Sequence, residues 1–128
     1  MVRKKVPYGI SDYKEIRNEK YLYVDKTEYI EYLENINTKY SVFLRPRRFG
    51  KTLFVSTLQY YYDRKYADDF DILFKDTYIG NHKTALAGSY YVLRLDFSKL
   101  DIENESKLKE SFSQSVYSSL CFFVNIII

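Results

Sequence analysis

The sequence has no tryptophan, one histidine and one cysteine among its 128 residues. A lone Cys121 excludes a disulfide framework and an all-cysteine metal site, which favours a reducing compartment. His82 has no partners at metal-ligand spacing, so it predicts no metal site. The apolar end, residues 120–128, is well short of the roughly 20 residues that cross a bilayer, and the basic start lacks the apolar run of a signal peptide. These absences predict a cytoplasmic protein without a membrane partner.

What is present is typical of one globular domain, residues 1–128. Hydrophobic residues make up 46% and charged residues 29%, and the net charge of +3 is too small to indicate an acidic partner. The chain holds 15 tyrosines and 9 phenylalanines. Such rings can stack on the bases of a nucleic acid, but most of them fall on stripes expected to face a core.

Apolar periodicity and cap residues predict both helices and strands. The expected helices are 11–19 with Ser11 as cap, 25–36 with Asp25 as cap, 51–62 and 105–120. The expected strands are 21–24, 40–44 and 90–97, and the apolar end is expected to be a third main strand or a dangling end. We therefore divide the chain into a helical lead-in (1–39), a strand–helix–strand unit (40–120) and an apolar tail (121–128).

The stretch "FLRPRRFGKT", Phe43 to Thr52, ends like a phosphate-binding loop. In such a loop the lysine, here Lys51, reaches the β- and γ-phosphates, and the hydroxyl, here Thr52, holds Mg²⁺. The backbone N–H groups of the loop and the start of the next helix bind phosphate oxygens. A strand at 40–44 and a helix at 51–62 supply the expected context.

The entrance of this loop departs from the standard pattern, because Arg45 stands where the first glycine belongs. Pro46 biases Arg45 toward extended geometry and removes one N–H donor from the loop. Arg47 and Arg48 would replace part of that loss, since guanidinium groups bind phosphate in a bidentate way. The alternative is a solvated basic patch. The candidate nucleotide-binding residues are Arg45, Pro46, Arg47, Arg48, Phe49, Gly50, Lys51 and Thr52.

The predicted order of elements along the chain is strand, loop, helix, long connection and strand. This order predicts that segments 40–44 and 90–96 pair side by side and parallel, through a right-handed crossover. The predicted fold class is α/β: a partial P-loop NTPase core with a mostly parallel sheet and flanking helices.

Two stretches, "YGISDYKEIRNEKYLYVDKTEYIEYL" and "VFLRPRRFGKTLFVSTLQYYYD", resemble the AAA-ATPase-like family over nearly the whole chain. The Arg-Pro-Arg-Arg-Phe-Gly-Lys-Thr loop and the upstream Val-Asp-Lys-Thr are that family's signatures, and the altered loop entrance is its standard form. The resemblance implies ATP and Mg²⁺ as cofactors. Members often continue into a Walker B strand and a C-terminal PD-(D/E)XK nuclease-like domain, so this chain resembles an N-terminal fragment.

Asp96, which closes "VLRLD", imitates the magnesium-binding acid of a Walker B strand. Arg94 interrupts the apolar run and Phe97 stands where a second acid would follow, so a structural carboxylate is the competing interpretation. With no base assigned, we expect ATP binding without efficient hydrolysis by this chain alone.

Two other functions stay open on the sequence. One is a basic nucleic-acid-binding module that uses Arg45, Arg47, Arg48 and Lys51 on a phosphate backbone. The other is a non-catalytic remnant that interacts with proteins. The uncharged "FFVNIII" end also predicts self-association.

Overall fold

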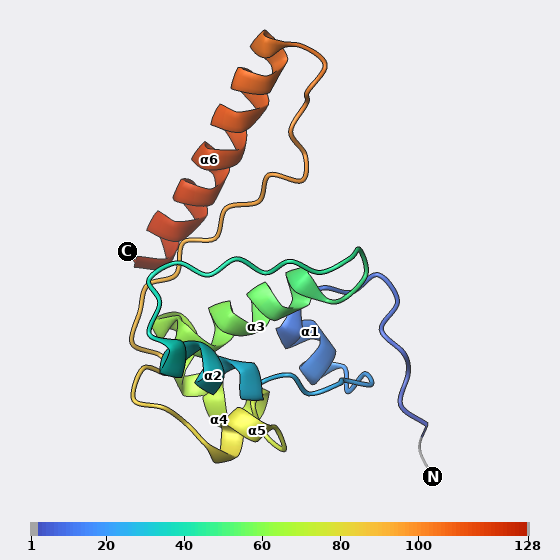
Figure 1. The fold of residues 1–128 in the computed structure, drawn as a ribbon, viewed down its shortest axis with the longest axis vertical. Helices are drawn as coiled ribbons and strands as arrows, with labels where there is room; N and C mark the ends of the chain where they lie inside the picture. Colours follow the sequence, from blue (N-terminus) through green and yellow to red (C-terminus); the bar gives the residue numbers. More distant parts are fainter. Residues whose placement is uncertain (1–2, 128) are drawn as a thin grey trace. The chain divides into compact units, whose positions relative to one another are not determined.

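A computed structural model describes residues 3–127, and every regular element in that range is a helix (Figure 1). The chain divides into an N-terminal unit, Met1–Tyr90, and a C-terminal unit, Tyr91–Ile128. Residues 1–2 and 128, at the ends of the predicted lead-in and tail, lie outside the described residues. The N-terminal unit contains α1 (Tyr13–Asn18), α2 (Glu28–Ile36), α3 (Lys51–Tyr62), a 3₁₀ helix (Arg64–Asp69), α4 (Phe70–Leu73) and α5 (Tyr78–Asn81).

The N-terminal unit is held together by a small core of aromatic rings. Tyr13 of α1 stacks on Phe74 with ring centroids 5.0 Å apart, and Phe70 stacks on the same ring at 5.2 Å. The Tyr13 hydroxyl donates to the Leu73 carbonyl at 2.9 Å, so its polar end is satisfied although the ring is buried. Burial raises the pKa of Tyr13 far above its ordinary value. The buried cluster consists of Tyr13, Ile30, Tyr61, Phe70, Leu73, Phe74 and Ile79.

Helix α1 is fixed to α3 through Asp12. This residue caps α1, because its carboxylate accepts the Glu15 N–H at 3.0 Å. The other carboxylate oxygen accepts the hydroxyls of Ser56 and Tyr60, both from α3. The predicted helix near residues 11–19 is therefore confirmed, with its cap at Asp12 and not at Ser11.

The predicted α/β fold with a mostly parallel sheet is wrong for the described residues. Segments 21–24, 40–44 and 90–97 form no strand, and the β-type pairing is a single isolated parallel bridge between Asp63 and Tyr90. The side chains of 40–44 favour a strand, but a strand also needs a neighbour to supply its ladder hydrogen bonds. Here Tyr40, Val42 and Leu44 are each at least 77% exposed, while Phe43 packs edge-on against Phe54.

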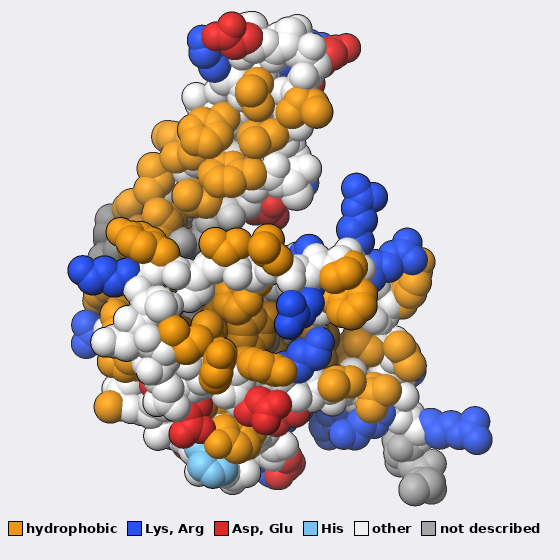
Figure 2. Space-filling model, in the orientation of Figure 1, with side chains coloured by type: hydrophobic (Ala, Val, Ile, Leu, Met, Phe, Trp, Pro, Cys, Tyr) orange, Lys and Arg blue, Asp and Glu red, His pale blue; other side chains and the backbone are white. Residues whose placement is uncertain are grey.

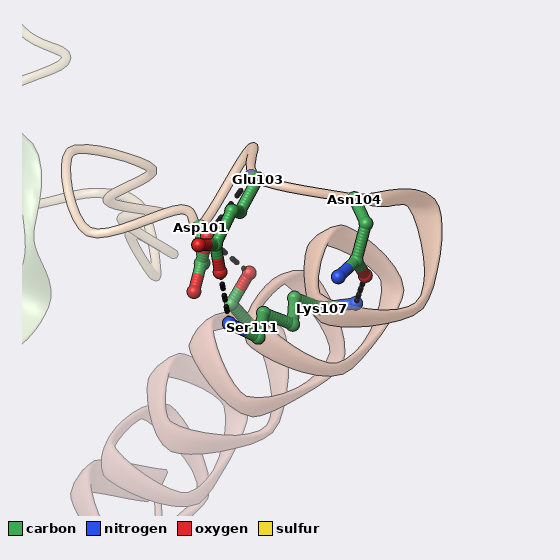
Figure 3. A network of polar contacts seen from close by, with 5 residues as sticks. All are labelled: Asp101, Glu103, Asn104, Lys107 and Ser111. Atoms are coloured by element: carbon green, nitrogen blue, oxygen red, sulfur yellow. Dashed lines mark hydrogen bonds and ion pairs between the residues drawn. The ribbon is translucent and has the colours of Figure 1, made fainter.

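The C-terminal unit contains one long helix, α6 (Glu105–Ile127). Asn104 lies immediately before it, and its side-chain oxygen accepts the Lys107 N–H at 2.9 Å. Figure 3 shows the surrounding network, in which Asp101 donates its N–H to Ser111 of α6 and accepts the N–H of Glu103. Glu103 and Lys107 form an ion pair one turn apart.

The predicted helix 105–120 is thus confirmed and extends further than expected. Residues 121–127 continue α6, so the predicted third strand at the apolar end is wrong. Apolar residues at four-residue spacing form one helical stripe that runs on into this end: Leu108, Phe112, Val116, Leu120 and Val124. β-Propensity considers each residue by itself and does not detect this spacing. Within residues 3–127, no helix combines the length and the apolarity needed to cross a membrane.

Candidate functional site

The loop before α3 turns sharply at its end. Gly50, the N-cap residue immediately before α3, has φ 76° and ψ 24°, a left-handed conformation that favours glycine. Arg48 also has a positive φ, 67°. The first hydrogen bond of the helix runs from the Phe54 N–H to the Gly50 carbonyl at 2.9 Å. The N–H groups before Phe54 have no partner inside the helix, and the helix dipole favours an anion beside them.

Lys51 folds back over this loop. It is the first residue of α3, and its ammonium group donates to the Arg45 carbonyl at the other end of the loop. An ammonium carries three N–H donors, so two remain for other acceptors. The guanidinium of Arg45 donates to the neighbouring Leu44 carbonyl at 3.0 Å. The loop is therefore closed by a lysine whose charge stays exposed to solvent.

A cleft of about 480 Å³ runs from this loop along α2. Its size is within the range of small-molecule sites, about 300–1,000 Å³. Its polar lining comes from Lys26, Arg45 and Lys51 and from the hydroxyls of Thr38 and Ser41, and most of the remaining lining is tyrosine, phenylalanine and aliphatic side chains. Figure 2 shows this arrangement as a hollow lined by hydrophobic side chains, with Lys and Arg side chains beside it and over the loop. The apolar lining comprises Tyr29, Tyr32, Leu33, Ile36, Tyr40, Val42, Phe43, Leu44, Phe49 and Phe54.

Lys26 approaches the same loop from another part of the chain. Its ammonium lies 3.4 Å from the Phe49 carbonyl, to which it donates. A side-chain carbon added at Gly50 would meet the same ammonium at 4.0 Å. Two lysines that are 25 positions apart in the sequence therefore reach one short loop.

The neighbours of Lys26 are bonded elsewhere. Asp25 accepts the Thr27 N–H and hydroxyl through one oxygen, at 2.9 and 2.7 Å, and the Tyr78 N–H through the other, at 2.7 Å. The buried Thr27 hydroxyl accepts the Ile79 N–H at 3.1 Å. Asp25 was expected to cap α2, but helix α2 begins at Glu28 without a side-chain cap. Asp25 and Thr27 instead bind the start of α5.

The structure brings part of the predicted site together. Four of the eight predicted residues line the cleft: Arg45, Phe49, Gly50 and Lys51. The other four are exposed residues of the loop and the first helical turn that do not line it: Pro46, Arg47, Arg48 and Thr52. Sequence reasoning assigned no role to Lys26 at this loop. The signal was the Asp-Lys-Thr triplet, which was interpreted as a helix start, with a role near the adenine as the alternative that the family resemblance implies.

Asp96, which the sequence offered as a magnesium ligand, belongs to the C-terminal unit. Its carboxylate accepts the Ser98 N–H at 2.9 Å. Hydrogen bonds from the Ser98 backbone and side chain hold the pKa of Asp96 below its ordinary value. The carboxylate is thus an exposed turn-forming group that is ionised at neutral pH, and its role with a metal stays a prediction.

The residues at the loop fit Mg²⁺ only as a companion of phosphate. In the described part of the chain, no three His, Cys, Asp or Glu side chains are grouped to hold a metal ion. Mg²⁺ commonly keeps several waters and takes one or two protein oxygens with substrate phosphates. The exposed Thr52 hydroxyl in the first turn of α3 offers one such oxygen.

Comparison with known proteins gives the class of protein to which this loop belongs. The model of a family described as "Predicted AAA-ATPase" matches residues 7–126. The chain therefore belongs to this AAA-ATPase-like family, as its motifs indicated, and membership suggests the use of a nucleotide.

One curated relative is similar over part of the chain. The "Uncharacterized protein in vnfD 5'region" of Azotobacter chroococcum mcd 1 is 49% identical over 59 residues, which are 45% of this chain and 11% of that protein. The chain thus matches a small part of a much longer relative. No solved structure matches it significantly.

Proposed function

We propose that this chain binds a nucleoside triphosphate, with ATP and Mg²⁺ as the physiological pair, through the loop Arg45–Thr52. One observation carries the proposal: Lys51 begins α3 and closes the loop by bonding the Arg45 carbonyl. This arrangement holds an ammonium group over the loop that leads into a twelve-residue helix, whose first N–H groups have no partner inside the helix. Both features attract the oxygens of a phosphate chain.

The cleft next to the loop supports a nucleoside as the rest of the ligand. Apolar and aromatic walls with a few polar groups are the usual features of a small-molecule site. Tyr29, Tyr32 and Phe54 offer ring surfaces against which a planar base would lie. When bound, Mg²⁺ would neutralise phosphate charge, with Thr52 as its protein ligand. Arg47 and Arg48, exposed on the loop, would contact phosphate oxygens from the solvent side.

The proposal covers binding and not efficient turnover. Phe97 follows Asp96 where a second acid would stand, and the Asp96 carboxylate already accepts the Ser98 N–H. An ionised carboxylate with a lowered pKa is a weak base. We therefore expect slow release of phosphate from ATP by this chain alone, and steady multiple-turnover hydrolysis would contradict this part of the proposal.

The test measures thermal unfolding with increasing Mg-ATP for wild type and Lys51→Ala. A ligand present at about a hundred times its Kd adds about 2.7 kcal/mol to the free energy of unfolding. Wild type should show a Tm that rises with ATP, and Lys51→Ala should show a much smaller rise with an unchanged far-UV spectrum. The matched control is Lys75→Ala, an exposed lysine that lines neither of the two clefts beside the loop. Equal rises in Tm for wild type and Lys51→Ala would refute the proposal.

Nucleic acid is the competing ligand of the basic loop. Phosphate-backbone binding weakens steeply with salt and does not require a nucleotide. Salt-dependent binding of a DNA duplex that persists in saturating ATP, together with no ATP-dependent rise in Tm, would favour that function over the one proposed.

A further inference from the structure

We propose that Lys26 is a second phosphate-binding residue of this site, contacting the phosphate chain from the segment before α2. The inference rests on the proposed nucleotide-binding function and assigns a role to a residue outside the loop motif. Lys26 lies in the segment before α2, whereas Lys51 is the first residue of α3.

The position of Lys26 is the first support. Its ammonium group donates to the Phe49 carbonyl, one residue before the glycine that caps α3. That bond uses one of its three N–H donors. The residue is exposed and lines both the 480 Å³ cleft and a second cleft of about 240 Å³ that also meets Gly50. A ligand that reaches the loop from the larger cleft would meet the remaining donors.

The second support is the set of hydrogen bonds that the neighbouring Asp25 carboxylate accepts. Asp25 is the nearest acid in sequence and would neutralise Lys26 if the two groups were paired. Both of its oxygens instead accept hydrogen bonds from Thr27 and Tyr78. Asp25 therefore does not pair with Lys26, whose ammonium group bonds to the loop instead.

The way the segment is fastened is the third support. Thr27 is fully buried, and its hydroxyl accepts the N–H of Ile79 at the start of α5. Asp25 and Thr27 thus attach the residues on both sides of Lys26 to α5. The backbone of Lys26 is fixed at two points, so less conformational freedom is lost when its side chain binds an anion.

The proposal is tested by calorimetric titration of wild type, Lys26→Ala, Lys26→Gln and Lys75→Ala with adenosine, AMP, ADP and Mg-ATP. Loss of one charge-assisted hydrogen bond weakens binding about tenfold to a hundredfold. We expect a loss of this size for ATP in both Lys26 variants, a smaller loss for AMP and none for adenosine. Lys75→Ala should bind like wild type.

Glutamine separates a phosphate contact from a purely structural role. Lys26→Gln keeps an N–H donor for the Phe49 carbonyl but carries no charge. If Lys26→Gln binds ATP as tightly as wild type, the lysine only holds the loop and the proposal is overturned. Equal ATP affinity of wild type and Lys26→Ala would overturn it as well.

The proposed function and this inference fail in different ways. If Lys51→Ala loses ATP binding while Lys26→Ala retains it, only the role of Lys26 is wrong. If wild type binds none of the four ligands, the nucleotide-binding function is wrong and the role of Lys26 falls with it.

Discussion

Replacing Thr27 with valine should destabilise the N-terminal unit by removing one buried oxygen. The Thr27 hydroxyl donates to Asp25 at 2.7 Å and accepts the Ile79 N–H at 3.1 Å. Valine has nearly the same shape, so the cavity term is negligible. Asp25 keeps two other donors, but the Ile79 N–H loses its acceptor in a place where both residues are fully buried.

The magnitude follows from that single unsatisfied donor. A buried polar group left without a partner costs about 1–3 kcal/mol. For a domain of 60–100 residues, each 1 kcal/mol lowers Tm by about 4–8 °C. We therefore expect Tm to fall by at least about 4 °C in Thr27→Val. Thr27→Ser keeps the oxygen and loses one methyl group, which costs about 1 kcal/mol.

Amide hydrogen exchange separates the two variants more sharply than Tm. In Thr27→Val the Ile79 amide should exchange faster relative to the amides of the aromatic core, because its acceptor is gone. In Thr27→Ser the Ile79 amide should keep its protection. If the Ile79 amide of Thr27→Val exchanged as slowly as in wild type, without a fall in Tm, the reasoning would be refuted.

Three further changes test other parts of the molecule. Gly80→Ala should unfold or strongly destabilise the N-terminal unit in a urea titration, because the new methyl carbon would lie 2.0 Å from the Phe74 carbonyl oxygen; near-wild-type stability would show that α5 shifts freely. Raising the pH should lower the stability of the same unit from about pH 10 to about 12, because burial raises the pKa of Tyr23 from 10.0 to about 12 and the protonated ring is the stable form. A titration of Tyr23 itself in the folded chain, followed through its ring resonances, that is centred at an ordinary pH of about 10 would contradict this. Removing residues 121–128 should reduce self-association in sedimentation experiments, since Phe122 and Val124 are 57% and 45% exposed; an unchanged association state would exclude this segment as its cause.

The helices of this chain could be predicted because their information is local. Leu53, Phe54, Leu58 and Tyr61 recur at helical spacing after Gly50, and α3 forms where they indicate. The same holds for α6, whose cap residue and first-turn pairs lie within a few positions of one another. Propensity and periodicity are sufficient for such elements.

The strands could not be predicted in the same way, because a strand is a relation between two segments. The residues of 40–44 have high β-propensity, yet propensity reports mainly how a side chain fits a pleated and partly buried surface. Without a neighbour among residues 3–127, the segment stays unpaired. Its Val42 and Leu44 side chains are 80% and 77% exposed.

One part of the candidate site could likewise be predicted from local sequence, and the other part could not. The loop motif placed Lys51 and Gly50 correctly at the start of a helix, since those residues are consecutive. The approach of Lys26 depends on Asp25 and Thr27 binding α5, about 50 residues further along the chain. No local sequence pattern indicates to which helix start the Asp-Lys-Thr triplet will form its hydrogen bonds.

Stability and ligand binding should be separable in this chain because they depend on different residues. The core gathers Tyr13, Tyr61, Phe70 and Phe74, which are buried, whereas every residue of 39–52 is exposed. Exposed side chains away from caps and strained positions usually change stability by less than about 0.5 kcal/mol. Substitutions of Lys51, Arg45 and Arg47 therefore report on binding without unfolding the protein. Thr27 is the exception, because it is buried in the core and also fixes the segment that carries Lys26, so its variants should lower stability and ATP affinity together.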